Sequence, residues 1–249
     1  MLIEIGHIES LFRYPVKSMA GGRLEAATLG WHGIEGDRRL AFRRMGDHSG
    51  MPWLTASRHP ELLLYVPVRR KDSSSEDIPT HIRTPDGHEL PAFSEELAAD
   101  VERCYGSPVE MIHFRNGIFD ETNLSVIASE TMSEIGRLAG LSLDVRRFRP
   151  NVVVRLSRPT AFQEDEWVGG LLTFGEGEDA PAIAVTMRDI RCSMVNLDPD
   201  SARPAPEVMK AVVREHQNTA GIYGTVTRCG RLEVGQPIFL HLATNTVPG

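Results

Sequence analysis

The sequence predicts a β-rich fold of the α+β class, with barrel-like sheets. Many short runs have strand character and are separated by glycine- and proline-containing turns, whereas only three segments have the spacing of amphipathic helices. Many short strands with few helices are typical of barrels and mixed sheets. The chain of 249 residues is long enough for one large domain or two modest ones. We expect two units, residues 1–115 and 116–249.

The first unit, residues 1–115, is expected to consist mainly of short strands joined by turns. Ser94 is expected to cap a helix that carries Leu97 and Val101 on one face. The serine-rich, charged run at 71–77 is expected to be an exposed loop. The expected strands cover residues 2–8, 24–29, 39–42, 62–68, 81–84 and 109–113.

The second unit, residues 116–249, contains the other two expected helices. Ser129 is expected to cap a short helix that ends at Gly140. Pro206 is expected to begin a helix that runs to His216, because proline is well tolerated in the first turn. The expected strands cover residues 125–128, 152–154, 171–174, 182–187, 221–226 and 237–242.

Composition restricts the classes of function. Hydrophobic residues make up 41% and charged residues 24% of the chain, as in ordinary globular proteins. The net charge of −7 argues against general nucleic-acid binding, which needs a positive surface. No apolar run approaches the ~18 residues of a membrane span. Three irregularly spaced cysteines favour a reducing compartment. We therefore expect a cytoplasmic protein that binds neither nucleic acid nor membrane.

Basic residues recur in loop-like positions of this acidic chain. Converging guanidinium and ammonium groups would suit one specific small anion, and a phosphate-bearing ligand is the simplest choice. The alternative is that these side chains form local surface ion pairs. The residues concerned are Arg13, Lys17, Arg38, Arg39, Arg58, Arg146, Arg147, Arg149 and Arg191.

Cys192 directly follows Arg191. A neighbouring cation favours the thiolate, which is the form that binds metals and attacks electrophiles. No second cysteine lies within a few residues, so neither a zinc knuckle nor a dithiol motif is formed here. A metal bound by this thiolate would need its other ligands from elsewhere, for example from a cofactor. The alternative is a buried, inert cysteine.

Several ordered motifs resemble one known family. Tyr14-Pro-Val-Lys-Ser18 and Gly36-Asp-Arg38 are similar to the N-terminal β-barrel module of MOSC proteins, named for the C-terminal domain of molybdenum-cofactor sulfurase. The later motifs are similar to the MOSC domain itself. They are Phe148-Arg-Pro-Asn151, Glu164-Asp-Glu-Trp167, Arg191-Cys192, Asp198-Pro199, Gly221-Ile-Tyr223 and Gly230-Arg-Leu-Glu-Val-Gly235. The resemblance implies an N-terminal barrel-like module over residues 1–115 and a MOSC β-barrel domain over residues 116–249. Similar architecture occurs in the mitochondrial amidoxime-reducing component and its bacterial homologues.

The resemblance also implies a cofactor and its contacts. Cys192 would be the catalytic thiolate that ligates molybdenum in a molybdenum cofactor (molybdopterin), and a soft thiolate suits such a site. Lys17, Ser18 and Arg38 would hold the phosphate. The pterin contacts implied are Arg149, Asn151, the Arg191 backbone region and Tyr223, with Thr122 and Ser129 lining the same cleft. Pyridoxal phosphate binding is a further label associated with the family.

The implied activity is that of an oxidoreductase that reduces N-hydroxylated or N-oxygenated small molecules. Electrons would come from a separate protein, such as a ferredoxin, a flavodoxin or a cytochrome b5-like protein with its reductase, because no cysteine-rich extension follows the second unit. The alternative function is a cofactor or sulfur carrier that uses a Cys192 persulfide and reduces no organic substrate.

Two positions depart from the usual family pattern, and four others are expected to have structural roles. Asp189 stands where the family often has a second cysteine, and Met19 stands where the amidoxime reducers often have another. Asp198 is expected to serve a turn rather than to move a proton. Glu164, Asp165 and Trp167 are expected to be structural.

Overall fold

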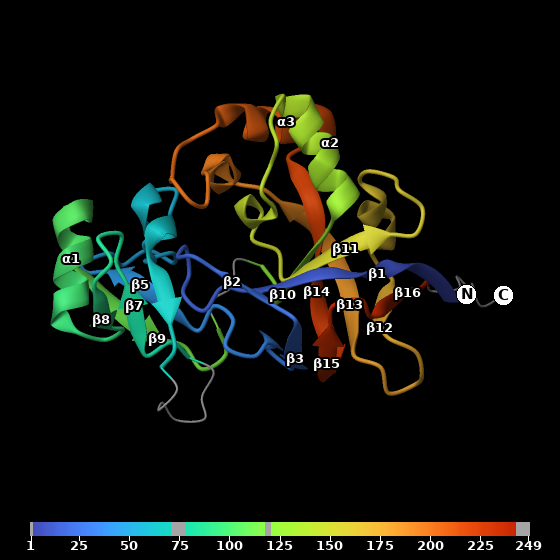
Figure 1. Ribbon diagram of the computed structural model, residues 1–249, viewed down its shortest axis with the longest axis horizontal. Coiled ribbons are helices and arrows are strands. Elements are labelled where there is room, and N and C mark those ends of the chain that lie inside the picture. Colours follow the sequence, from blue (N-terminus) through green and yellow to red (C-terminus); the bar gives the residue numbers. More distant parts are fainter. Residues whose placement is uncertain (1, 71–77, 118–120, 243–249) are drawn as a thin grey trace.

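The computed structural model describes residues 2–70, 78–117 and 121–242. The expected loop at 71–77 lies outside the described residues, and so does Asp120, near the start of the expected second unit. Within these ranges, a closed seven-stranded barrel is the largest element, and a smaller group of strands packs with α1 beside it (Figure 1). The helices α2 and α3 lie over one side of the barrel. The prediction of a β-rich α+β fold is confirmed.

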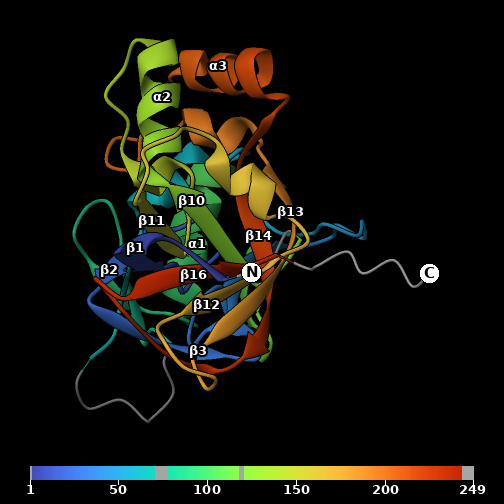
Figure 2. The ribbon, with the colours of Figure 1, turned by 90° about the vertical axis from the view of Figure 1, so that its right-hand side faces the viewer.

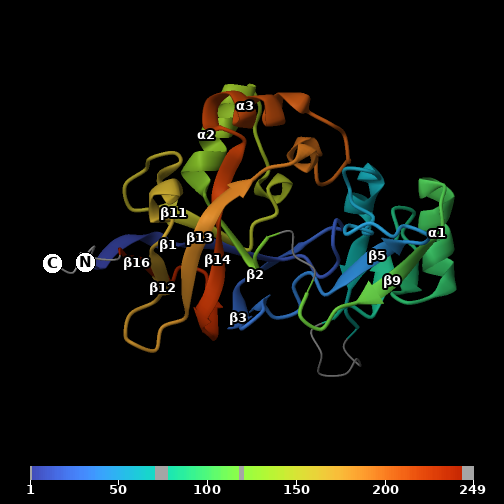
Figure 3. The same cartoon turned by 180° about the vertical axis from the view of Figure 1, so that it is seen from behind.

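The barrel is closed by β1 (Leu2–Arg13), which pairs with β16 (Pro237–His241) on one side and β11 (Val152–Leu156) on the other. Around the ring the order is β11, β10, β14, β13, β12, β16 and β1. Only β10 and β11 run parallel among these pairs of described strands. The remaining strands are β10 (Leu124–Ala128), β12 (Leu171–Phe174), β13 (Ala182–Ile190) and β14 (Thr219–Arg228), the last two running side by side in Figure 3.

The position of β1 links the two expected units. This strand belongs to residues 1–115, yet it lies between strands from the second unit, with Ile8 opposite Val154 and Leu11 opposite Val152. The expected boundary between residues 115 and 116 therefore does not separate the strands of the barrel.

Apolar side chains fill the barrel interior because they alternate along its strands. Val126, Val154 and Ile222 are completely buried in this core. A small sheet of β3 (Ala26–Gly30), β4 (Gly33–Ile34) and β15 (Gly230–Glu233) contributes further side chains to the same core. Neither β4 nor β15 is predicted, because both are very short and flanked by glycine.

A second core lies in the smaller group of elements at the left of Figure 1. Ser94 caps its helix as predicted, since the Ser94 hydroxyl accepts from the Leu97 N–H at 3.2 Å. The strand expected at 62–68 is wrong in its first half. There, Pro60 begins a 3-10 helix, and only residues 66–68 form a strand. The elements are β5 (Leu40–Arg44), η1 (Pro60–Leu64), β6 (Val66–Val68), β7 (His81–Arg83), β8 (Glu89–Pro91), α1 (Glu95–Tyr105) and β9 (Val109–His113).

The helices α2 (Ser129–Ala139) and α3 (Pro206–His216) pack against each other above the barrel (Figure 2). Gly140 ends α2 in a left-handed conformation, and α3 has the predicted bounds. The expectation that Ser129 caps α2 is wrong, because Ser129 is the first residue of the helix. No helix among the described residues is both long and apolar enough to cross a membrane.

Glu164 connects the start of α2 to a neighbouring 3-10 helix. This carboxylate lies in η3 (Gln163–Trp167) and is fully buried. It accepts from the Ala128 N–H at 3.2 Å and from the Thr131 hydroxyl at 2.8 Å. Burial raises the pKa of Glu164, and the hydrogen bonds oppose that effect. The structural role expected for Glu164 follows from these contacts.

Closure of the barrel makes Gly6 intolerant of any side chain. A Cβ at Gly6 would lie 2.0 Å from the carbonyl oxygen of Arg155, across the β1–β11 pairing. We expect Gly6→Ala to lower the free energy of unfolding by about 1–3 kcal/mol, as overpacked cores do. Chemical denaturation measures this value. Gly22→Ala, in β2 (Gly22–Leu24), is the control because no atom lies within 4 Å of the added Cβ. Equal stability of the two variants would contradict the prediction.

Candidate functional site

A cavity of about 360 Å³ lies where the turn after β1, the end of β13, the middle of β14 and the loop before β11 meet. Seven of the residues predicted to form a site line this one cavity, although they are distributed over more than 200 positions of the chain. These seven are Lys17, Ser18, Arg38, Arg149, Arg191, Cys192 and Tyr223.

Cys192 is exposed at this cavity. It follows β13 directly and precedes η4 (Ser193–Asn196), so its thiol lies where the chain leaves the barrel. The alternative of a buried cysteine is therefore wrong. A solvent-accessible thiol at a cavity wall can ligate a metal or attack an electrophile.

The cavity wall is positively charged overall, in contrast to the acidic chain. Among the residues that the structure describes, five basic side chains and two acidic ones line it, whereas the whole protein has a formal charge of −7. A concave site lined by one sign of charge attracts ligands of the opposite sign. The two acidic residues are Glu121 and Asp189, and the basic ones are Lys17, Arg38, Arg147, Arg149 and Arg191. Five of the nine basic residues predicted to converge therefore line this cavity, whereas Arg13, Arg39, Arg58 and Arg146 do not.

Three residues of the cavity have an uncommon backbone conformation. Ser18, Arg38 and Arg149 have φ values of 65°, 50° and 50°. Residues other than glycine rarely adopt positive φ, and such conformations cluster at functional sites because the surrounding structure must hold them there. The backbone around this cavity is therefore fixed by its neighbours rather than by local preference.

Arg38 joins the two halves of the site. Its guanidinium pairs with Asp37 and donates to the Arg149 carbonyl at 2.9 Å and to Asn151 Oδ1 at 3.3 Å. Burial alone would lower the pKa of Arg38, but Asp37 and Tyr223 outweigh it, and the net shift is upward. Arg38 thus stays charged and fixes the loop before β11.

Arg149 holds the same loop from the other side. Its guanidinium donates to the Met19 carbonyl at 2.6 Å and lies 4.2 Å from the centre of the Tyr14 ring, a cation–π contact. Gly21 makes room for this ring, because a Cβ there would lie 2.2 Å from it. The turn after β1 is therefore packed directly onto the segment before β11.

Arg191 and Asp189 form a buried ion pair behind Cys192. The distance between Arg191 NH2 and Asp189 Oδ2 is 2.7 Å, and the side chains are 7% and 1% exposed. Arg191 also donates to the carbonyls of Ala220 and Phe148, each at 2.7 Å. The guanidinium expected to act on the adjacent thiol is thus committed to a carboxylate and two carbonyls.

Three predicted residues lie outside the cavity lining. Asn151 is buried, and its side-chain oxygen accepts from Arg38 and from the Ser125 N–H at 3.2 Å. Thr122 donates to the Gly224 carbonyl at 3.1 Å, and Ser129 donates to the Val154 carbonyl at 3.2 Å. Ser129 lines a different cavity, next to α2. The roles suggested for these three residues as cofactor contacts remain predictions.

Comparison with known families shows which family the chain belongs to. A family model described as the MOSC domain matches residues 93–239, and one described as the MOSC N-terminal beta barrel domain matches residues 5–105. The chain belongs to the MOSC family. Domains of this family are associated with binding of the molybdenum cofactor. Among curated proteins, no sequence matches the chain.

One solved structure shares the fold of this MOSC protein over nearly its whole length. The YUAD protein from Bacillus subtilis is 15% identical, with a TM-score of 0.54 over 98% of this chain and 99% of that one. YiiM from Geobacillus stearothermophilus is 18% identical, with a TM-score of 0.37 over 48% of this chain and 54% of that one. At 15% identity, the likeness to the YUAD protein concerns the fold alone.

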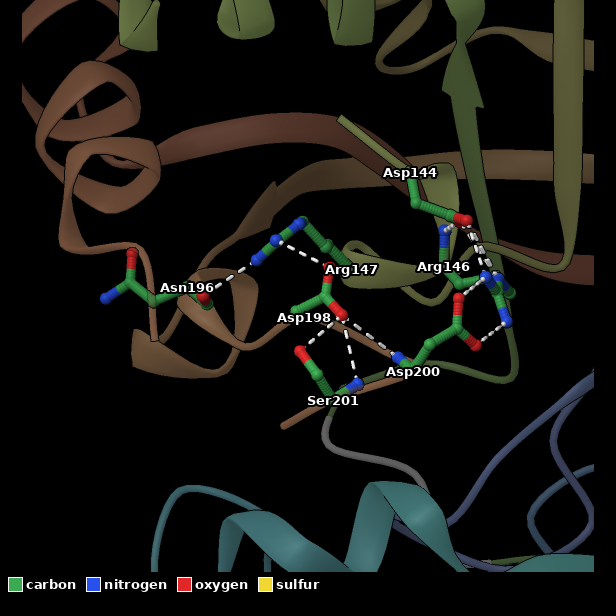
Figure 4. Close-up of polar contacts among 7 residues, drawn as sticks. All are labelled: Asp144, Arg146, Arg147, Asn196, Asp198, Asp200 and Ser201. Atoms are coloured by element: carbon green, nitrogen blue, oxygen red, sulfur yellow. Dashed lines mark hydrogen bonds and ion pairs between the residues drawn. The ribbon is translucent and has the colours of Figure 1, made fainter. Parts of the chain in front are cut away.

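In the MOSC domain, Asp198 organises the loop that follows Cys192 (Figure 4). One of its oxygens accepts from the backbone of Asp200 at 3.2 Å and from both the backbone and the hydroxyl of Ser201, at 3.0 and 2.8 Å. Its other oxygen pairs with Arg147 at 3.0 Å, and Arg147 also donates to the Asn196 carbonyl. The Ser201 hydroxyl bond is the main cause that lowers the pKa of Asp198. The expectation that Asp198 serves a turn follows from this geometry.

Arg146 anchors the same loop at a second point. It pairs with Asp144 and Asp200, both at 2.6 Å (Figure 4). Arg146 and Arg147 together tie the 3-10 turn η2 (Val145–Arg147) to the segment after Cys192. The loop that follows Cys192 is thus held by Arg146 at Asp200 and by Arg147 at Asp198.

Sequence reasoning did not find several residues of this MOSC cavity. Ser125, Glu121 and Phe148 line it, as do the apolar Met51 and Ile190 at exposed positions. Ser125 occurs in a predicted strand and has no distinguishing signal. Asp189 was noted only for the cysteine it replaces, although a charged residue near the end of an apolar strand is itself a signal.

Removing the Asp198 side chain tests its structural role. We expect Asp198→Ala to lower the free energy of unfolding by about 1–2 kcal/mol through the lost hydrogen bonds. Asp198→Asn is the control, because an amide oxygen still accepts from the turn. The lowered pKa means that the wild-type contribution is lost as pH falls below about 4. Urea denaturation of both variants measures this effect, and equal losses would contradict the turn role.

Proposed function

We propose that this protein binds the molybdenum cofactor through Cys192 and reduces N-hydroxylated small molecules. The electrons would come from a separate ferredoxin, flavodoxin or cytochrome b5-like protein. One observation carries the proposal: an exposed thiol opens into a cavity whose wall has five basic and two acidic side chains. This combination suits an anionic cofactor that needs a single sulfur ligand from the protein.

The residues present fit such a group. Lys17 and Ser18 offer an ammonium and a hydroxyl on a rigid turn at the cavity, and both suit phosphate oxygens. Arg149 and Tyr223 line the same wall and would contact the pterin. Cys192 would ligate the metal, since soft thiolates suit a sulfur-rich metal environment. When bound, the cofactor would supply the two-electron chemistry.

The protein's own contribution would be binding and orientation. Arg38 and Arg149 hold the turn after β1 against the loop before β11, so the anion-binding groups and Cys192 keep fixed relative positions. Preorganised groups of this kind stabilise charge at little cost of rearrangement. The substrate would enter beside the exposed side chains of Met51 and Ile190.

Metal and pterin content together test cofactor binding. We expect freshly purified protein to contain molybdenum and pterin, and Cys192→Ser to lose most of the molybdenum because a hydroxyl is a poor ligand for a soft metal. Elemental analysis and pterin fluorescence after oxidation measure the two contents. Cys104→Ser is the matched control, since Cys104 is another exposed cysteine. Equal molybdenum in both variants would refute the role of Cys192 as ligand.

Turnover separates a reductase from a carrier. With a chemical electron donor, we expect the protein to reduce benzamidoxime or a hydroxylated nucleobase, and Cys192→Ala to abolish the reaction. Consumption of the donor is followed together with product formation, and Cys104→Ser should keep wild-type rates. Bound cofactor or labile sulfur without any turnover would overturn the reductase proposal in favour of a carrier.

A further inference from the structure

Two carboxylates lie on the wall of the Cys192 cavity, and they differ sharply in their surroundings. Glu121 is exposed, whereas the Asp189 side chain is 1% exposed. Asp189 precedes Cys192 by three residues, near the end of β13. The register of β13 against β14 shifts between Arg188 and Ile190. Such a bulge redirects a side chain. Arg188 is partly exposed and Ile190 is exposed, whereas Asp189 between them is buried.

Asp189 is surrounded by donors from several elements. The Ser125 hydroxyl, on β10, donates to Asp189 Oδ2 at 2.9 Å, and Arg191 pairs with the same oxygen at 2.7 Å. Tyr223, on β14, is also hydrogen-bonded to this carboxyl, and Arg38 acts on it through its charge. The carboxyl is therefore fixed in position at the inner wall of the cavity. Burial nevertheless raises the pKa of Asp189 to about 6, against the opposing effects of Arg191, Ser125, Arg38 and Tyr223.

The proposed reaction consumes protons at this cavity. In the reduction R–NH–OH + 2e⁻ + 2H⁺ → R–NH₂ + H₂O, the N–O bond breaks and the oxygen leaves as water. The electron-transfer protein supplies both electrons. The other ionisable groups on the wall are permanently cationic guanidiniums, the Lys17 ammonium, the Tyr223 phenol, the thiol and the exposed Glu121. Among the described residues of the wall, Asp189 is the buried carboxyl.

We propose that Asp189 donates a proton to the departing oxygen in the Cys192 cavity. This inference rests on the proposed reductase function. One proton passes from the Asp189 carboxyl to that oxygen, the second comes from solvent, and Asp189 regains its proton from solvent before the next turnover. Ser125 and Tyr223 are positioning residues that hold the carboxyl toward the cavity.

The pH dependence of kcat tests the donor role. A protonated donor is active below its pKa, so wild-type kcat is expected to fall as pH rises through about 6. Asp189→Asn should lower kcat at the optimum by about 100-fold, as loss of a general acid typically does, and should remove this pH limb. Molybdenum content should stay at the wild-type level. Asp86→Asn is the control, because Asp86 is exposed and lies outside the cavity lining, and we expect it to keep the wild-type kcat and pH profile.

A second variant and a spectroscopic measurement cover the case in which Asp189→Asn does not fold. The Ser125 hydrogen bond lowers the pKa of Asp189, so Ser125→Ala should move the pH limb upward. Infrared difference spectra of the wild type should show a carboxyl that loses its proton over the same pH range. A merely structural Asp189 would show the same titrating band but would leave the kcat limb of Ser125→Ala unshifted.

The outcomes separate the two proposals. If the wild type turns over no N-hydroxylated substrate, the reductase function fails and the donor role fails with it. If the wild type is active but Asp189→Asn keeps its kcat and pH limb, only the donor role is overturned. An unshifted limb in Ser125→Ala would overturn it equally.

Discussion

The pairing of β1 with both β16 and β11 is the constraint on which the site depends. Because β1 is a strand of the barrel wall, the turn that follows it emerges beside the end of β13 and the middle of β14. Lys17 and Ser18 therefore lie at one cavity with Cys192, although they are far apart in the sequence. A closed barrel has a fixed strand order and stagger, so this meeting is set by backbone pairing and not by side-chain contacts alone.

Buried charges then fix the loops that the barrel brings together. Arg38 with Asp37, and Arg191 with Asp189, are pairs with little exposure to water. Removing one partner of such a pair is costly, because the other charge remains buried. Their remaining donors bind backbone carbonyls of the loop before β11, at Phe148 and Arg149. The net effect is a rigid, positively charged wall around an accessible thiol, in a protein that is otherwise acidic.

Much of the fold was predictable because its signals are local. The helix at 206–216, the cap at Ser94 and the strands at 109–113 and 171–174 follow from periodicity and capping residues. The place of β1 among the strands of the barrel was not predictable, because strand partners depend on pairing over the whole chain. The 3-10 turn at Pro60 was missed because its leucines also fit a buried strand.

For the site, residue chemistry was predictable and orientation was not. The thiol and most of the basic residues were found from motifs, yet Asn151 is directed toward Arg38 and Ser129 toward β11. The bulge that buries Asp189 depends on the register of β13 against β14, which the sequence pattern does not encode.

The central claim is that Cys192 contributes one sulfur to a metal bound in this cavity. X-ray absorption at the molybdenum edge tests this ligand on the wild type and on the molybdenum that Cys192→Ser retains. We expect one fewer sulfur neighbour around the retained molybdenum than around the molybdenum of the wild type. The same number of sulfur neighbours in both proteins would contradict it, as would a wild type that binds no molybdenum.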